Sequence, residues 1–324
     1  MLNEILKEAW RKLRGAAVGE APSPERAQAL LRSGDAAAAH AMLLRLVQES
    51  PLEPGGHAAL GWACRALGDD AGAERHARDA LALKADVNSA HLLLATLELR
   101  GVYYVEILAR IHQVLRPRTY VEIGVFKGKS IVLARPETDA IGIDPEPRPV
   151  VELGPRCRIV AMTSDAYFAG HDLTAELGGR PVDLALIDGM HRCEFALRDF
   201  ANLERHCTPG STILMHDGHP LDEITSARER TTTFWTGDTW RAVLALRKYR
   251  PDLSVQTLAS PPSGLTVVRR LDPASRVLAE RMAEIEADMH AMDFGILRGA
   301  KAEMLGVVPA DLDAIDALFA ARPA

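Results

Sequence analysis

The chain has 324 residues, of which 48% are hydrophobic and 25% charged, so it can build a large domain and a smaller one and is not a disordered protein. Its net charge of −6, with no dense lysine and arginine stripe, argues against nucleic acid as a partner, because neutralised phosphates supply most of that affinity. The four cysteines form no CxxC pair, which speaks against a zinc finger or a disulfide framework and favours the reducing cytoplasm.

The segment Met1–Arg14 is predicted to be amphipathic, with its apolar residues at helical spacing. It lacks the uninterrupted apolar core of a signal peptide. No stretch of the chain approaches the roughly 18–20 apolar residues that are needed to cross a bilayer. We therefore expect a soluble, cytoplasmic protein that does not associate with a membrane.

Residues 1–112 are rich in alanine, leucine and arginine and are predicted to be helical. Gly34-Asp35 recurs as Gly68-Asp69, and Ala39 recurs as Ala73, at a spacing of 34 residues. The pattern resembles the tetratricopeptide repeat, a helix pair of that period. An ordinary helical bundle with a chance repeat is the alternative. In both cases we expect a helical annex that could hold a second copy of the chain or a protein partner.

From Thr119 the pattern changes to short β-branched runs that alternate with helical stretches, as in a parallel sheet with helices on both faces. Two further runs are joined by Ala259–Gly264, whose prolines and glycine suit a reversal. The expected strands are Tyr120–Gly124, Ala140–Asp144, Arg158–Met162, Val182–Asp188, Thr212–Asp217, Leu253–Leu258 and Leu265–Arg270. We predict an α/β domain over residues 113–272, a Rossmann-like doubly wound sheet of five parallel strands and an antiparallel C-terminal hairpin, followed by an all-α region over residues 273–324.

The first strand ends in a glycine-containing run that is typical of a nucleoside site, because ligands of parallel sheets bind at the carboxyl ends of strands. The candidate binding residues in the run are Glu122, Gly124, Phe126, Gly128 and Ser130. Phe126 occupies the second glycine position of a dinucleotide fingerprint, and the spacing to Gly128-Lys129-Ser130 is one residue too short for a phosphate-binding P-loop. Glu122 suits a cationic ligand group instead, such as the amino end of S-adenosylmethionine.

Acidic residues also follow the second and third strands. Asp144 lies 20 residues after Gly124, where a carboxylate can accept hydrogen bonds from both ribose hydroxyls. Ser164 and Asp165 follow the third strand, where the aspartate can accept from the adenine amino group; the alternative is that this pair caps the next helix. Three successive strands thus end in a glycine or an acidic residue, namely Gly124, Asp144 and Asp165. Together these residues indicate an adenosyl ligand.

The fourth strand ends in Asp188-Gly189-Met190-His191, and the fifth ends in His216-Asp217. Because neighbouring strands deliver Asp188 and Asp217 to one sheet edge, their carboxylates should converge, and two such oxygen ligands beside open positions suit Mg²⁺. An imidazole from His216 favours Mn²⁺, Fe²⁺ or Zn²⁺ instead. A metal-free site, in which His216 is a polar rim residue and Asp217 caps a turn, is the alternative.

At these residues the chain resembles the family of macrocin-type O-methyltransferases and the cephamycin-pathway methyltransferase, which are class I methyltransferases. The matching positions are Glu122, Gly124, Gly128, Ser130, Asp188-Gly189-x-His191, Asp199, Pro209-Gly210 and His216-Asp217. The resemblance implies S-adenosylmethionine as the cofactor and a metal held by Asp188 and the pair at the fifth strand, whose first acid is replaced here by His216. It also favours His191 as the general base, since an imidazole titrates near pH 6.5.

Residues 218–239 form an unusually long polar connection, as expected of a loop that covers an active site. Arg228 and Arg230 are available for an anionic acceptor, and Trp235 for contact with substrate, whereas Trp240 is expected to anchor the following helix. Together these features predict methylation of a hydroxyl on a small molecule, a sugar-bearing compound or a secondary metabolite, with Asp188 and His191 in catalysis. A nicotinamide-dependent oxidoreductase and a non-catalytic scaffold that uses the repeats are the alternatives.

Overall fold

The computed structural model describes residues 23–320, and the segment Met1–Arg14 lies outside them. The chain divides into two compact units, Met1–Leu93 and Leu94–Ala324. None of the helices in the described part is both long enough and apolar enough to span a membrane.

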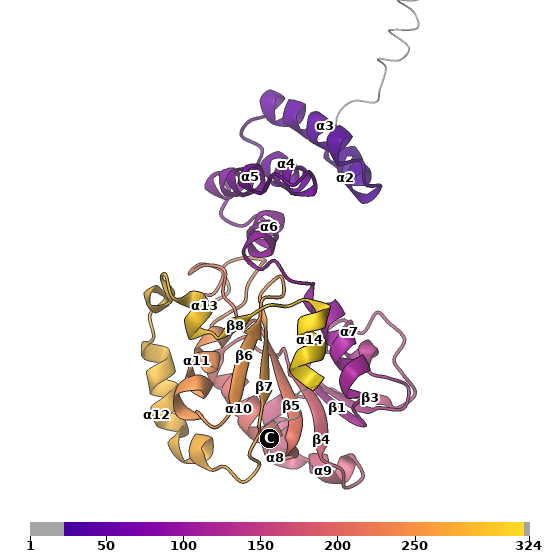
Figure 1. The fold of residues 1–324 in the computed structure, drawn as a ribbon, viewed down its shortest axis with the longest axis vertical. Helices are drawn as coiled ribbons and strands as arrows, with labels where there is room; N and C mark the ends of the chain where they lie inside the picture. Colours follow the sequence, from indigo (N-terminus) through magenta and orange to yellow (C-terminus); the bar gives the residue numbers. More distant parts are fainter. Residues whose placement is uncertain (1–22, 321–324) are drawn as a thin grey trace, which may run out of the picture. The chain divides into compact units, whose positions relative to one another are not determined.

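The first unit is a series of antiparallel helices (Figure 1). Its helices are α2 (Pro24–Arg32), α3 (Ala36–Glu49), α4 (Pro54–Ala66), α5 (Asp70–Leu83) and the first part of α6 (Asn88–Glu98). Residues 34 positions apart in the sequence also occupy equivalent places in the helices. Gly34 and Gly68 both end a helix with a positive φ of 85° and 82°, a conformation that glycine adopts without steric cost.

The following aspartates repeat the same local structure. Asp35 and Asp69 each cap the next helix by accepting a hydrogen bond from a backbone N–H three residues on, at 3.0 and 2.8 Å. Ala39 and Ala73 are both fully buried. Each 34-residue repeat is therefore one helix pair with a small residue at the same packing position.

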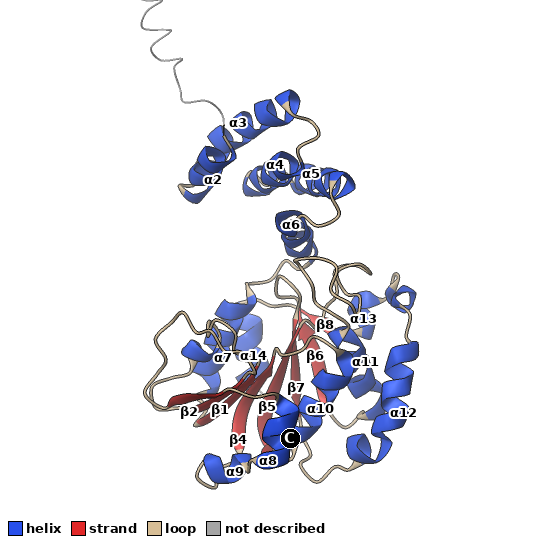
Figure 2. Ribbon diagram, turned by 180° about the vertical axis from the view of Figure 1, so that it is seen from behind, coloured by secondary structure: helices blue, strands red, loops and turns tan. Residues whose placement is uncertain are grey.

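The second unit is built on one mixed sheet of eight strands with the order β3-β2-β1-β4-β5-β7-β6-β8 (Figure 2). The strands are β1 (Thr119–Ile123), β2 (Asp139–Ile143), β3 (Cys157–Val160), β4 (Val182–Ile187), β5 (Cys207–His216), β6 (Ser254–Leu258), β7 (Leu265–Arg269) and β8 (Val307–Val308). The first five are parallel, and β7 pairs antiparallel with both β5 and β6. The predicted α/β class, parallel strands and terminal hairpin are thus observed.

Helices cover both faces of this sheet (Figures 1 and 2). On one face lie α10 (Cys193–Glu204), α11 (Thr239–Tyr249) and α12 (Val277–Ala291); on the other lie α7 (Tyr104–Leu115) and α14 (Leu312–Ala320). Alternate strand residues supply the two cores: Ala185 and Ile187 of β4 pack in the first, and Leu184 and Leu186 in the second. This burial of both faces explains the nearly continuous apolar strands of the sequence.

The C-terminal region differs from the predicted all-α extension. The strand β8 pairs parallel with β6 through Val307 and Val308, which makes an eighth strand that the sequence analysis did not predict. Two valines are too short a run to be recognised as a strand from their pattern alone. The remaining connecting elements are α8 (Ser164–Gly170), α9 (Leu173–Glu176), α13 (Lys301–Met304) and the 3-10 helices η1 (Ile131–Leu133) and η2 (Phe294–Leu297).

The helix α7 belongs to the α/β unit. It packs against α14, and its residues Ile107 and Ile111 join one of the sheet's two cores. The compact α/β unit accordingly begins at Leu94.

Candidate functional site

The end of β1 approaches the end of β4 at very short range. Gly124 has a φ of 89°, and a Cβ at this position would lie 2.0 Å from the backbone oxygen of Asp188. The glycine is therefore required by contact between two strand ends, in addition to any contact with a ligand. This contact brings the candidate cofactor loop beside the candidate catalytic residue.

Glu122 is fully buried on β1 and accepts two hydrogen bonds, from the hydroxyl groups of Tyr120 at 2.6 Å and Ser130 at 2.7 Å. Burial and the nearby charge of Asp188 together raise the pKa of Glu122 to about 8, although both hydrogen bonds favour its ionised form. Glu122 and Ser130 are thus brought together, as the sequence predicted for one site. The carboxyl group is protonated at neutral pH in the absence of a cation.

Asp144 holds the loop after β1. One of its carboxylate oxygens accepts hydrogen bonds from the backbone N–H groups of Val125 and Phe126, at 2.9 and 2.8 Å, and the other accepts from Glu146 at 2.7 Å. These contacts fix the backbone at Phe126, whose φ is 42° and whose side chain is 58% exposed. Gly128 follows with a φ of 74°. The loop is therefore rigid at its start and presents an exposed aromatic ring.

The third predicted strand end is arranged differently. Thr163, and not Ser164, caps α8 by accepting from a backbone N–H at 3.2 Å. Asp165 lies in the first turn of α8 and pairs with Arg198, with 3.0 Å between their charged atoms. Asp199 of α10 is buried next to the pocket, and burial raises its pKa to about 7. Asp165 is thus engaged by an arginine in the structure described here.

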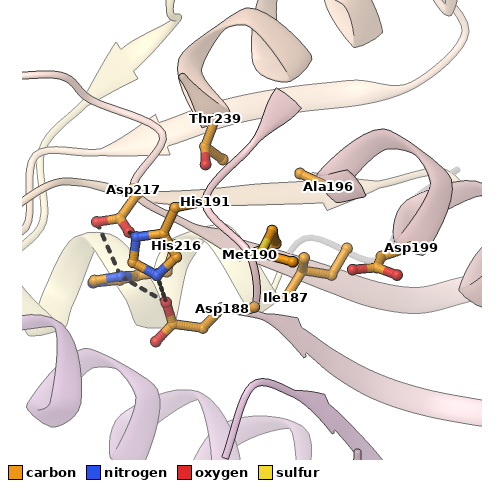
Figure 3. A pocket seen from close by; sticks show the side chains of 10 residues that line it. Ile187, Asp188, Met190, His191, Ala196, Asp199, His216, Asp217 and Thr239 are labelled. Atoms are coloured by element: carbon orange, nitrogen blue, oxygen red, sulfur yellow. Dashed lines mark ion pairs between the residues drawn. The ribbon is translucent and has the colours of Figure 1, made fainter. Parts of the chain in front are cut away.

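The residues predicted for catalysis and metal binding converge in one pocket at the ends of β4 and β5 (Figure 3). Oδ1 of Asp188 lies 3.4 Å from Nε2 of His191 and 3.3 Å from Nδ1 of His216. Asp217 lies 2.8 Å from Nδ1 of His191 through Oδ2 and 3.2 Å from Nδ1 of His216 through Oδ1. Each carboxylate therefore faces both imidazoles. The pocket is lined by Ile187, Asp188, Gly189, Met190, His191, Ala196, Asp199, His216, Asp217 and Thr239.

Two of these residues have an unusual backbone. The described residues include five non-glycine residues with positive φ, among them His191 at 54° and Asp217 at 58°, and Phe126 of the neighbouring loop is a third. Such conformations cost of order 1–3 kcal/mol and persist where the surrounding structure imposes them, commonly at functional sites. The backbone is therefore strained where the candidate catalytic side chains meet.

The pocket also contains polar atoms whose hydrogen-bonding capacity is not used. Nδ1 of His216 and Oδ2 of Asp217 are buried, and within residues 23–320 neither has a partner in good hydrogen-bond geometry despite the short contacts. Atoms of this kind suit a shared cation. One ligand atom from each of Asp188, His191 and Asp217 lie within 4.8 Å of one another. The donor set, carboxylate oxygens with imidazole nitrogens, fits a divalent transition metal as well as Mg²⁺.

The charged side chains of the cluster shift one another's pKa values. Burial disfavours the cationic form of both imidazoles, but the charges of Asp217 and Asp188 outweigh it and raise the pKa of His216 to about 10 and that of His191 well above its usual value. Burial likewise opposes ionisation of the aspartates, whereas the histidines lower the pKa of both. Without a metal, the two aspartates favour the protonated form of both histidines.

Sequence reasoning missed two residues that contact the cluster. The ring of Tyr104 lies with its centroid 4.2 Å from that of His216, and burial raises the pKa of its hydroxyl. Ser263, in the turn between β6 and β7, lies 3.4 Å from Nε2 of His216 through its hydroxyl. No local pattern signals either residue, because Tyr104 belongs to a helix that precedes the sheet and Ser263 to a reversal that was expected only to connect strands.

The loop over residues 218–239 packs against His191. The ring of Trp235 stacks on the imidazole at 5.4 Å and 10°, and its indole N–H donates to a backbone carbonyl within the loop at 2.7 Å. Trp240 is buried as the anchor of α11. Arg228 pairs with Glu194, and the guanidinium of Arg230 donates to backbone carbonyls of the loop, so both arginines support the loop in this structure.

A family model and several solved structures are similar to part of this chain. Residues 121–218 match the family model described as a methyltransferase domain, and no curated protein matches the chain significantly. Similar solved structures include cofactor-bound Rv0187 from MTB, with 16% identity over 52% of this chain and 79% of that chain and a TM-score of 0.42.

Two other structures of this kind are O-methyltransferases. TomG from Streptomyces achromogenes, in complex with SAM, has 14% identity, covers 52% of this chain and 80% of its own, and has a TM-score of 0.40. The O-methyltransferase from Bacillus cereus, in complex with SAH, has 13% identity, covers 51% and 79%, and has a TM-score of 0.38.

The matched segment extends from β1 to the residue after Asp217 and so contains both the candidate cofactor loop and the catalytic cluster. This part of the α/β unit is therefore similar to a methyltransferase domain.

Proposed function

We propose that the protein transfers the methyl group of S-adenosylmethionine to a hydroxyl oxygen of a small molecule, a sugar-bearing compound or a secondary metabolite. The convergence of Asp188, His191, His216 and Asp217 in one strained pocket beside the β1 loop carries the proposal. In-line methyl transfer needs the nucleophile and the methyl group aligned at near contact, and orientation of this kind can contribute several kcal/mol. The pocket between the strand ends is the place where both reactants would meet.

We assign the cofactor to the loop after β1. Glu122 would receive the cationic amino group, which would also compensate the cost of ionising this buried carboxyl. Gly124, Gly128 and Ser130 would shape the loop around the amino acid part, and Phe126 would contact the nucleoside with its exposed ring.

The adenosine would extend toward β2 and β3. Asp144 already accepts three hydrogen bonds from backbone N–H groups. Its remaining lone pairs would accept hydrogen bonds from the ribose hydroxyls. Ser164 and Asp165 would lie near the adenine, and in this arrangement Asp165 exchanges its contact with Arg198 for the adenine amino group.

We assign a divalent ion to Asp188, His216 and Asp217. The buried unpartnered atoms of His216 and Asp217 support this assignment, and the imidazole favours Mn²⁺, Fe²⁺ or Zn²⁺ over Mg²⁺. When bound, the ion supplies a positive charge that lowers the pKa of a hydroxyl beside it. His191 faces the same pocket and would accept the hydroxyl proton, with Asp188 orienting its imidazole.

Calorimetry of the full chain tests the cofactor. We expect S-adenosylhomocysteine to bind, and NAD, the ligand of the alternative oxidoreductase, to leave the baseline unchanged. A chain that binds NAD and ignores S-adenosylhomocysteine would overturn the proposal. A panel of hydroxylated small molecules, with S-adenosylhomocysteine formation as the readout and Mn²⁺ or chelator added, then tests the acceptor and the ion.

We further propose that the 34-residue helix pairs of the first unit are tetratricopeptide-like and serve association, with a second copy or a protein partner. The repeated turn glycines and buried alanines support this assignment. Light scattering of the full chain, and of the chain from residue 94 on, would compare their oligomeric states.

A further inference from the structure

A second cluster of ligand-type side chains lies in the helical unit, within residues of the first unit alone. His57 comes from the first turns of α4, and His76 and Asp79 are three residues apart on one side of α5. Oδ2 of Asp79 lies 3.7 Å from Nδ1 of His57 and 3.6 Å from Nδ1 of His76. Each of the three residues offers one ligand atom, and these atoms all lie within 4.8 Å of one another.

The neighbourhood of His57 fixes which ring nitrogen carries its proton. Nε2 lies 2.9 Å from the backbone oxygen of Pro51. A carbonyl oxygen can only accept, so Nε2 is the donor, and in the neutral ring Nδ1 is left with its lone pair directed at Asp79. A ligand histidine whose other nitrogen donates to a backbone carbonyl is the usual arrangement at protein metal sites.

Neither Nδ1 atom is satisfied by the rest of the described chain. Those of His57 and His76 are buried and have no hydrogen-bond partner among residues 23–320. Both Nδ1 atoms thus face one carboxylate oxygen without a hydrogen bond, which is unfavourable for buried polar atoms unless a cation or a proton is shared among them.

A neutral imidazole is the form that ligates metals, because metal ions compete with protons for the same lone pair.

We propose that His57, His76 and Asp79 bind a divalent transition-metal ion, with Zn²⁺ as the best fit, through the two Nδ1 atoms and one carboxylate oxygen. Zinc accepts this donor set at about 2.0–2.2 Å, which puts tetrahedral ligands roughly 3.4 Å apart. The observed 3.6 and 3.7 Å require only a small contraction. The Asp79 side chain is 47% exposed, so an ion can enter from solvent and keep a water as its fourth ligand.

Occupancy would join α4 to α5, the helix pair of the second 34-residue repeat. An ion that binds the folded unit and not the unfolded chain stabilises the fold by mass action. The site would therefore act on the stability of the helical unit, separately from methyl transfer.

The test uses the full chain with Asp188→Asn and Asp217→Asn, which silence the candidate metal site in the pocket of the α/β unit. After chelator treatment and dialysis, we expect calorimetric titration with Zn²⁺ to show one equivalent bound. Asp79→Asn and His76→Gln added to this chain should each weaken binding by at least about a hundredfold, since each removes a ligand. Glu74→Gln is the matched control, an exposed carboxylate of the same helix paired with Arg78, and should leave the affinity unchanged.

Circular dichroism of each variant identifies a folding failure. Nitrogen NMR of the histidines gives a second measurement on the chain that keeps all three ligands. Addition of Zn²⁺ should shift the Nδ1 resonances of two rings and leave the proton on their Nε2 atoms. The proposal is overturned if the folded silenced chain binds no zinc, if the ligand variants bind as tightly as the control, or if no histidine Nδ1 responds.

Discussion

His191 is placed between two carboxylates, and this placement decides its chemistry. An isolated imidazole would titrate near pH 6.5 and could accept a proton at neutral pH. The charges of Asp188 and Asp217 raise its pKa well above that value. His191 can therefore act as the proposed base only if a positive charge near the two aspartates lowers its pKa again. The proposed ion would supply that charge.

Replacement of His191 tests its role. We expect His191→Gln to lower the rate of methyl transfer by about 10²–10⁴-fold, the usual contribution of a general base, with S-adenosylhomocysteine affinity within about threefold of the wild type. His206→Gln is the control, because His206 bonds to Thr174 away from the pocket and should keep full activity. Equal rates in the two variants would remove His191 from the mechanism.

Glu122 makes the stability of the protein depend on pH. Its pKa is about 8 in the folded chain and near 4.5 when exposed, so between these values the folded state holds a proton that the unfolded state has released. The free energy of unfolding should then fall as pH rises from about 5 to 8, with a slope of at most about 1.4 kcal/mol per pH unit from this group.

Glu122→Gln should make that slope shallower by about 1 kcal/mol per pH unit, because the amide cannot ionise. Urea unfolding at several pH values between 5 and 8 measures it. Asp199, whose pKa burial raises to about 7, acts in the same direction and should preserve part of the slope in the variant. The exposed Glu137 serves as control, and Glu137→Gln should leave the slope above pH 5 intact. Parallel slopes for Glu122→Gln and the wild type would show that Glu122 is ionised in the folded protein.

At the scale of elements, the loop over residues 218–239 is held against His191 by backbone contact. The N–H of Asp238 donates to the carbonyl of His191 at 3.1 Å, and Trp235 stacks on its ring. Gly237 makes this approach possible: a Cβ there would lie 1.8 Å from the same carbonyl oxygen. The loop and the candidate base are thus positioned as one structure.

We expect Gly237→Ala to displace the loop and to destabilise the protein by about 1–3 kcal/mol, the usual cost of forcing atoms into a packed site. Gly178→Ala separates this clash from backbone strain, because Gly178 has a similar φ, 66° against 58°, and open space around its Cα. Gly178→Ala should cost about 1–2 kcal/mol from backbone strain alone, and Gly237→Ala more, because the clash adds to the same strain. Only the Gly237 variant should also change the fluorescence of Trp235. Identical behaviour of the two variants would mean that the loop is not held in the described position.

The parts of the site that the sequence predicted are those fixed by parallel-strand geometry. Asp188 and Asp217 end adjacent strands, and adjacent strands of a parallel sheet share one functional edge, so their convergence follows from the strand pattern. Glu122 lies on β1 and Ser130 in the loop that follows it, and both were predicted as parts of one run at the end of that strand.

The sequence did not predict the contacts that depend on tertiary packing. Nothing in the local pattern indicates that Tyr104 reaches His216, that Asp144 turns its carboxylate back to the loop of Phe126, or that Arg198 occupies Asp165. Each depends on how a helix or loop lies on the sheet, which period and propensity do not specify. The brief strand β8 was missed because only its pairing with β6 makes it a strand.

At the scale of the whole α/β unit, the C-terminal region completes the fold. The helix α14 packs on α7, with Arg110 of α7 donating to Asp316 at 2.7 Å, and β8 extends the sheet beyond the hairpin. Since α7 also carries Tyr104, the last helix of the chain supports the element that contacts His216.

Because α14 packs on α7, we expect one buried side chain of α14 to have a large effect on the free energy of unfolding. Ile315 of α14 is fully buried in the core shared with Ile107 and Ile111 of α7, whereas Leu312 of the same helix is 45% exposed. Ile315→Ala should lower the free energy of unfolding by about 2–5 kcal/mol through lost burial and a cavity, and Leu312→Ala by about 0.5 kcal/mol or less. Urea unfolding of both variants measures the difference. If the two substitutions cost the same, α14 does not pack on α7 in solution, and the last helix would not belong to the core that positions the site.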